Sequence, residues 1–237
     1  MNANRQTRST NFPAPSGNSR FLAPSYWIDW QHPAIVEQAA RLAHAADGTL
    51  TIARRSFLFV RDQIRHSWDY RQNQVTCRAS DVLAQTTGFC YAKSHLLAAL
   101  LRANNIPAGL CYQRLPVGKS GSPFCLHGLN AILLPGIGWH RVDARGNKPG
   151  IRSEFSPPVE RLAFSVNPGD GTDIPGIWAE PWHSVVDTLS RYDSVQDVAL
   201  HLPDAIRGDT PPDAHWGARP VIEADTSSTN VSYWRLV

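Results

Sequence analysis

One cysteine stands where a loop gives way to a strongly helical stretch. The breaker Thr86-Thr87 precedes Gly88-Phe89-Cys90, and the run Phe89–Ala103 predicts an amphipathic helix. A thiol in the first turn of a helix lies near unpaired backbone N–H groups and the positive end of the helix dipole. That position favours the thiolate, which is the nucleophilic form of cysteine. We therefore predict that Cys90 is a nucleophile.

A nucleophilic thiol needs a base, and the histidine nearest in sequence is poorly placed for that role. His95 lies five positions after Cys90, which at 100° per residue turns it about 140° away around the helix. The side chains that share a face with Cys90 are Ser94, Leu97 and Leu101. The base must come from elsewhere in the chain.

A predicted β-hairpin supplies a histidine and a carboxylate. The apolar runs Leu126–Leu134 and Trp139–Asp143 are joined by the short turn Pro135-Gly136-Ile137-Gly138. His127 and Asp143 each lie eight residues from Pro135, so we expect them almost opposite each other with Cβ atoms about 5 Å apart. An imidazole oriented by a carboxylate is the base that a thiol or hydroxyl nucleophile requires.

Two segments carry these residues in order, GFCYAKSHLLAALLRANNIPAG and LHGLNAILLPGIGWHRVDARGN. Over roughly residues 50–150 the chain resembles the transglutaminase-like superfamily, in which Gly-x-Cys opens a helix and an Ile-Pro-Ala element, a His and an Asp follow. The resemblance implies a papain-like/transglutaminase-like core and thioester chemistry without a cofactor. Cys90 would attack an amide or ester carbonyl, His127 would protonate the leaving group, and Asp143 would orient His127.

The surroundings of the triad depart from the family pattern. Leu129 stands two residues after the histidine, where the family commonly has an aromatic residue, and Asp143 is followed by Ala144 rather than proline. Arg145 is either a clamp for a substrate carboxylate or a charge that holds the loop. Asn130 either assists the site or ends a polar strand face.

The oxyanion of the reaction needs two donors. In the family the backbone N–H of the nucleophile supplies one, and an upstream group supplies the other. Trp68, Tyr70 and the region of Cys77 are the candidates for that second donor.

The elements that position these residues are helices first and strands afterwards, which predicts an α+β domain with N-terminal helices packed on an antiparallel β-sheet. Ser80 is a candidate N-cap for a short helix. The aromatic-rich segment 21–30 is extended in character and predicts a strand. Helices are expected at 33–46, 50–65, 81–85 and 89–103, and strands at 108–115, 126–134 and 139–143.

Three regions are expected along the chain. Residues 1–20 have almost nothing to bury and predict a disordered tail. Residues 21–202 form the transglutaminase-like domain, with a catalytic core at about 50–150. Residues 203–237 are rich in Pro, Gly, Asp, Thr and Ser and predict an irregular C-terminal tail.

Composition narrows the class of protein. Hydrophobic residues make up 42% and charged residues 18%, and the formal net charge is only +3. The charges are scattered, so we expect no nucleic-acid partner. No signal segment and no run of about 18 apolar residues occurs, which predicts a cytoplasmic protein without a membrane partner. The four cysteines form no C-x-x-C pair, so reduced thiols and no metal are expected.

These observations favour a thiol-dependent acyl hydrolase or transferase acting on peptide or side-chain amide bonds, with a peptide or protein as substrate. Hydrolysis is favoured over amine transfer. One alternative is a non-catalytic domain that uses its cleft to bind a peptide or protein. A second alternative is a small-molecule acyltransferase that uses a thioester donor.

Overall fold

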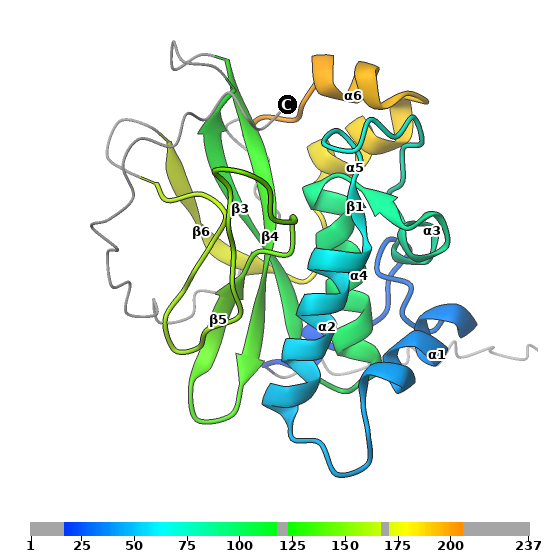
Figure 1. Ribbon diagram of the computed structural model, residues 1–237, viewed down its shortest axis with the longest axis vertical. Coiled ribbons are helices and arrows are strands. Elements are labelled where there is room, and N and C mark those ends of the chain that lie inside the picture. The colour runs from blue at the N-terminus through cyan, green and yellow to red at the C-terminus, as the bar shows by residue number, and fades with distance from the viewer. Residues whose placement is uncertain (1–16, 118–122, 167–170, 206–237) are drawn as a thin grey trace, which may run out of the picture.

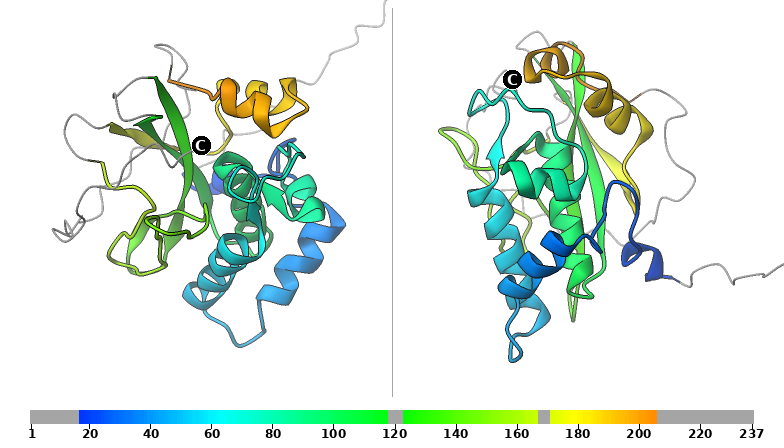
Figure 2. Two further views of the ribbon diagram at one scale, coloured as in Figure 1. Left: turned by 45° about the horizontal axis from the view of Figure 1, so that its top comes forward. Right: turned by 90° about the vertical axis from the view of Figure 1, so that its right-hand side faces the viewer.

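Helix α4 (Cys90–Ala103) lies at the centre of the fold, with helices on one side and a β-sheet on the other (Figures 1 and 2). The computed structural model describes residues 17–117, 123–166 and 171–205. Every residue from Cys90 to Arg102 is buried. The sequence predicted an amphipathic helix here, and that prediction is wrong because α1, α2, α3 and the sheet together cover the helix on all sides. The predicted α+β class is confirmed.

The N-terminal helices were predicted close to their observed bounds, and they are α1 (Pro33–Leu42), α2 (Thr49–Gln63) and α3 (Ala79–Gln85). Pro33 occupies the first turn of α1, and the His32 side chain caps it by accepting a hydrogen bond from the backbone of Ala34 at 3.3 Å. These are the local signals that start a helix.

Two local predictions in this half of the chain are wrong. The segment 21–30 forms no strand, because Phe21 ends the 3-10 helix η1 (Ser19–Phe21) and the chain then runs as a loop into α1. Ser80 does not cap α3. It lies inside the first turn, where its hydroxyl donates to Asp29 at 2.6 Å, and Arg78 is the capping residue.

The main sheet is antiparallel, with strand order β5-β4-β3-β6. The predicted strands are confirmed as β3 (Ala108–Pro116), β4 (Phe124–Leu134) and β5 (Gly138–Val142). The edge strand β6 (Thr172–Trp178) was not anticipated. Pro175 and Gly176 interrupt its apolar pattern, and both residue types are typical of edge strands and irregular strands.

The β4–β5 hairpin forms, but its register differs from the predicted one. Leu134 pairs with Gly138 and Asn130 with Val142, so the turn is centred on Gly136. In this register Asp143 lies just beyond β5 and is diagonal to His127 rather than directly opposite. A diagonal neighbour on the same sheet face remains within reach of long side chains.

A second, two-stranded sheet joins the helices near the start of α4. Strand β1 (Arg65–His66) pairs in parallel with β2 (Thr87–Gly88). This pairing places the end of α2 beside the residues that precede Cys90.

The last described elements are α5 (His183–Arg191) and α6 (Val195–Leu200), and they return the chain to the sheet (Figure 2). The backbone N–H of Leu126 donates to the carbonyl of Pro203 at 2.7 Å. Most of the two predicted tails, 1–20 and 203–237, lies outside the described residues. Within the described part of the chain, no helix is long and apolar enough to cross a membrane.

Candidate active site

Cys90 is the first residue of α4, and tight packing before it determines how the chain enters the helix. Phe89 is the extended N-cap residue. A Cβ added at Gly88 would lie 3.1 Å from both Ala92 Cβ and Thr76 Oγ1, so the chain has little room for a side chain there. Gly88, the glycine of the Gly-x-Cys pattern, therefore allows the chain to pack closely against Ala92 and Thr76. Cys90 lies in the first turn of the helix, where backbone N–H groups lack helical partners.

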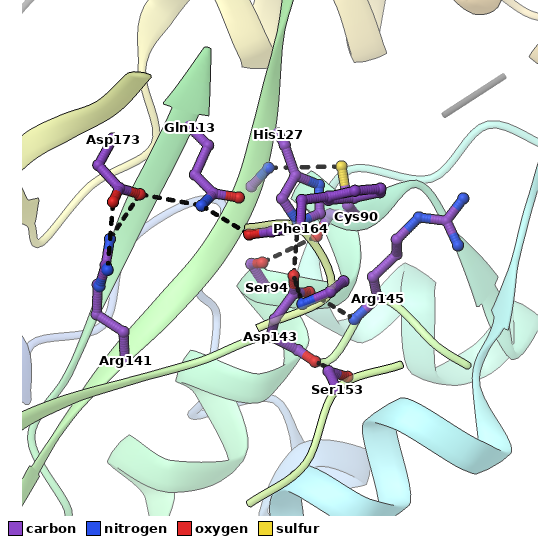
Figure 3. A network of polar contacts seen from close by, with 12 residues as sticks. Cys90, Ser94, Gln113, His127, Arg141, Asp143, Arg145, Ser153, Phe164 and Asp173 are labelled. Carbon is purple, nitrogen blue, oxygen red and sulfur yellow. Dashed lines mark hydrogen bonds and ion pairs between the residues drawn. The ribbon is translucent and has the colours of Figure 1, made fainter. Parts of the chain in front are cut away.

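His127 and Asp143 form a buried pair beside this helix end (Figure 3). His127 Nε2 and Asp143 Oδ2 are 2.7 Å apart, and both side chains are fully buried. Asp143 also accepts backbone hydrogen bonds from Arg145 at 3.1 Å and from Ala163 at 3.1 Å. These contacts fix the orientation of the carboxylate.

The contact between the two side chains favours a positively charged His127 and a negatively charged Asp143. Burial alone would lower the pKa of His127, but the charges of Asp143 and Cys90 and the hydrogen bonds to them raise it to about 10. Burial raises the pKa of Asp143, yet the charge of His127 and the hydrogen bonds hold it below its ordinary value. An imidazolium at neutral pH is the state that supports a neighbouring thiolate.

Gly128 lets strand β4 approach the first turn of α4. Its backbone N–H donates to Cys90 Sγ at 3.5 Å. A Cβ at this position would lie 3.0 Å from Tyr91 Cδ1 and 3.1 Å from Tyr91 Cα. The strand therefore brings His127, the preceding residue, close to the thiol. Because Nε2 of His127 is held by Asp143, Nδ1 is the ring nitrogen left to exchange a proton with Cys90.

All four cysteines are unpaired and buried. Burial raises the pKa of Cys77, Cys111 and Cys125 to about 12. None of these three begins a helix. His95 Nδ1 lies 2.8 Å from the carbonyl oxygen of Cys77, so its ring faces away from Cys90 as expected.

Residues far along the chain cover the His–Asp pair, and sequence reasoning missed them. The Phe164 ring packs edge-on against His127 with centroids 4.8 Å apart. Gln113 pairs with His127 across β3 and β4, and its side chain donates to the Phe164 carbonyl at 3.3 Å (Figure 3). The Ser153 hydroxyl donates to the Asp143 carbonyl at 2.7 Å. No local pattern marks these residues, because their role depends on the folded loop 153–164.

The four auxiliary candidates, Trp68, Tyr70, Asn130 and Arg145, bind other groups or line a neighbouring pocket. Asn130 Nδ2 donates to the carbonyls of Ser94 and Gly109 at 2.9 and 3.2 Å, which ties α4 to the sheet. Trp68 is half-buried and Tyr70 is 57% exposed, and both line a pocket next to the site.

Arg145 is committed to an ion pair. Its guanidinium is 1% exposed and lies 2.7 Å from Asp69, which also receives the ammonium of Lys148. Little capacity remains in this side chain for a substrate carboxylate. Within the ranges that the structure describes, no group of three or more His, Cys, Asp or Glu side chains is arranged to hold a metal ion.

A thiol at a helix start, next to a histidine and an aspartate carried by a hairpin, is the arrangement of thiol-dependent α+β proteins. The family model described as the transglutaminase-like superfamily matches residues 37–144, somewhat less than half of the chain. The matched range contains Cys90, His127 and Asp143.

Two solved structures are similar to parts of the chain. A protein from Cytophaga hutchinsonii named as a candidate cysteine protease shares 18% identity, with a TM-score of 0.45, over 56% of this chain and 43% of that one. A protein named as a TGase shares 17% identity, with a TM-score of 0.33, over 63% of this chain and 38% of that one. The chain thus spans less than half of either protein. No curated protein sequence matches it.

Proposed function

We propose that the protein is a thiol-dependent acyl hydrolase or transferase that cleaves peptide or side-chain amide bonds through a Cys90–His127–Asp143 triad. The observation that carries the proposal is the buried His127–Asp143 pair at 2.7 Å, held beside a cysteine at the start of α4. The match of residues 37–144 to the transglutaminase-like superfamily model supports thiol chemistry.

In the first half of the reaction, the Cys90 thiolate attacks the carbonyl carbon of the amide. The carbonyl oxygen becomes an oxyanion, for which the backbone N–H of Cys90 is one donor. The C–N bond then breaks as the His127 imidazolium gives its proton to the leaving amine. A thioester on Cys90 and a neutral imidazole remain, and Asp143 keeps that imidazole oriented.

In the second half, water or an amine attacks the thioester. His127 removes a proton from the attacking molecule, and Cys90 leaves as the thiolate, which restores the starting ion pair. We favour water as the acceptor, and the product is then a carboxylic acid. The four unpaired thiols support a reducing compartment such as the cytoplasm as the place of action.

The proposal is tested by incubating the protein with Gln-peptide, peptide-amide and ester probes and measuring release of ammonia, amine or alcohol together with the intact mass. Wild type should turn over at least one probe and form an acyl adduct on Cys90. Cys90→Ala should abolish turnover and the adduct. Cys111→Ala is the matched control, because it removes another buried thiol, and it should retain both.

If Cys90→Ala retains the wild-type rate, the proposed nucleophile is wrong. If wild type binds peptide but turns over no probe in the panel, and Cys90→Ala binds equally, the non-catalytic binding domain becomes the better explanation.

A further inference from the structure

A pocket of about 570 Å³ lies beside the nucleophile, between the end of α2, the segment 66–71 and the loop 146–149. This volume is within the range of roughly 300–1,000 Å³ that is usual for ligand pockets. Two lining residues connect it to Cys90. His66 pairs with Gly88, and its ring lies 5.7 Å from that of Phe89, while Lys93 is one turn further along α4.

The lining carries an excess of positive charge. Asp62 is paired with Arg61 at 2.7 Å, and Asp69 is paired with Arg145 and Lys148. The two remaining arginines, Arg65 and Arg71, are exposed, and neither forms an ion pair with any residue that the structure describes. The basic lining residues are Arg61, Arg65, Arg71, Lys93 and Lys148, and the acidic ones are Asp62 and Asp69.

Lys93 is a buried cation without a carboxylate partner among the described residues. It is 1% exposed, and its ammonium donates to the backbone carbonyls of Ile64 and Arg61, where α2 ends. An ammonium has three donors, so one is left over. Burial and the nearby charge of Arg145 lower the pKa of Lys93 to about 7. An anion in the pocket would stabilise the charged form.

His66 adds a buried polar group to the same wall. Its side chain is 3% exposed, and Nδ1 forms no hydrogen bond within the described part of the chain. The nearest carboxylate oxygen, Oδ2 of Asp69, is 3.6 Å away, which is too far for a hydrogen bond. Burial and the charges of Arg145, Lys93 and Lys148 hold the pKa of His66 well below its ordinary value. Buried polar groups are nearly always paired, so Nδ1 of His66 is a polar atom that a ligand in the pocket can engage.

We propose that this pocket binds a carboxylate of the substrate, so that the enzyme acts on peptides with an acidic side chain or a terminal carboxylate near the bond that is cleaved. This inference rests on the proposed function. Arg65 and Arg71 at the rim bind the carboxylate with charge-assisted hydrogen bonds, and Lys93 supplies positive charge from the pocket floor.

The first test compares hydrolysis of mono-p-nitrophenyl glutarate, which carries a carboxylate, with that of neutral p-nitrophenyl butyrate. Wild type should favour the glutarate ester about tenfold in kcat/KM, a factor that corresponds to about 1.4 kcal/mol. Arg65→Gln and Arg71→Gln should each reduce this preference about two- to fivefold. Arg41→Gln is the matched control, because this exposed arginine pairs with Glu37 on α1, away from the pocket. It should keep the preference.

Equal kcat/KM for the two esters, or a full preference in the Arg65→Gln/Arg71→Gln double variant, overturns the pocket assignment even if turnover depends on Cys90. Turnover that does not depend on Cys90 overturns the proposed function instead. The pocket then still has its own test, which is calorimetric titration of Cys90→Ala with N-acetylglutamate and with N-acetylglutamine. The glutamate compound should bind more tightly, and salt should weaken it. Equal binding of the two compounds overturns the inference.

Discussion

The sharpest test of thiol activation compares two cysteines of the same chain. Cys90 and Cys77 are 7% and 8% exposed, so access to a small reagent is nearly equal. Their surroundings differ, because only Cys90 starts a helix and has His127 beside it. Burial raises the pKa of Cys77 to about 12. At pH 7 this leaves about one Cys77 thiol in 10⁵ as thiolate.

An ordinary thiol, with a pKa of about 8.5, has a thiolate fraction at pH 7 about 3,000-fold larger than that of Cys77. A stabilised thiolate is intrinsically less nucleophilic, and a Brønsted slope of about 0.5 over this difference of about 3.5 units removes a factor of about 60. An ordinary thiol would therefore be labelled about 50-fold faster than Cys77. Because Cys90 starts a helix and has His127 beside it, we expect iodoacetamide to label Cys90 at least about 50-fold faster than Cys77 at pH 7.

The assay is isotope-coded alkylation followed by peptide mass spectrometry over a time course. Unfolding in urea should bring the two rates together, which controls for intrinsic peptide reactivity. His127→Gln should reduce the ratio sharply. His183→Gln, a change at an 80%-exposed histidine side chain, should leave it unchanged. A ratio near one in the folded wild-type protein would refute the activation of Cys90.

Four further outcomes are expected. Because His127 must be protonated, the activity of wild type should fall as the pH rises through about 10. Asp143→Asn should move this fall in activity to lower pH and reduce kcat about 10²- to 10⁴-fold. An unchanged pH–rate profile of the variant would contradict the pairing of His127 with Asp143. The pair should contribute fully to stability between about pH 4 and pH 6.5, where Asp143 is ionised and His127 is protonated in the folded state. It should lose that contribution as the pH rises towards 10, which urea titrations across this range would detect. Gly128→Ala should lower the free energy of unfolding in urea by about 1–3 kcal/mol and reduce activity, because the new Cβ meets Tyr91 in the first turn of α4. Wild-type stability and wild-type activity in this variant would show that strand β4 has room to move. Arg145→Gln should lower the free energy of unfolding by about 3 kcal/mol, because it leaves the Asp69 carboxylate with Lys148 as its remaining ion-pair partner. A loss of activity with full stability would instead favour a substrate-binding role for Arg145.

Much of the fold was predictable because its signals are local. Pro33 and the apolar spacing after it predicted α1, and the turn residues 135–138 predicted the hairpin. The register of that hairpin was not predictable, because a turn centred on residue 135 or 136 has almost the same composition. That single position moved Asp143 from directly opposite His127 to a diagonal place beyond β5.

The failures at α4 and at the segment 21–30 have another cause. Lys93 and Arg102 gave α4 an amphipathic pattern, yet both side chains are buried because backbone carbonyls accept their hydrogen bonds. The aromatic residues of the segment 21–30 suggested a strand. They instead pack as a loop, in which Trp30 Nε1 donates to the Leu22 carbonyl at 3.0 Å. In both places, hydrogen bonds that form only in the folded structure override local propensity.

The sequence by itself determined which residues could react and in what local setting: a cysteine opening a helix, and a histidine and an aspartate on the two arms of a hairpin. Only the tertiary structure decided how they meet and what surrounds them. The contact between Asp69 and Arg145 joins positions 76 residues apart, and β1 pairs with β2 across 22 residues. Helical and strand periodicity describe neighbours a few residues apart, so they contain no information on contacts of this range. The charged pocket beside Cys90 is built entirely from such contacts.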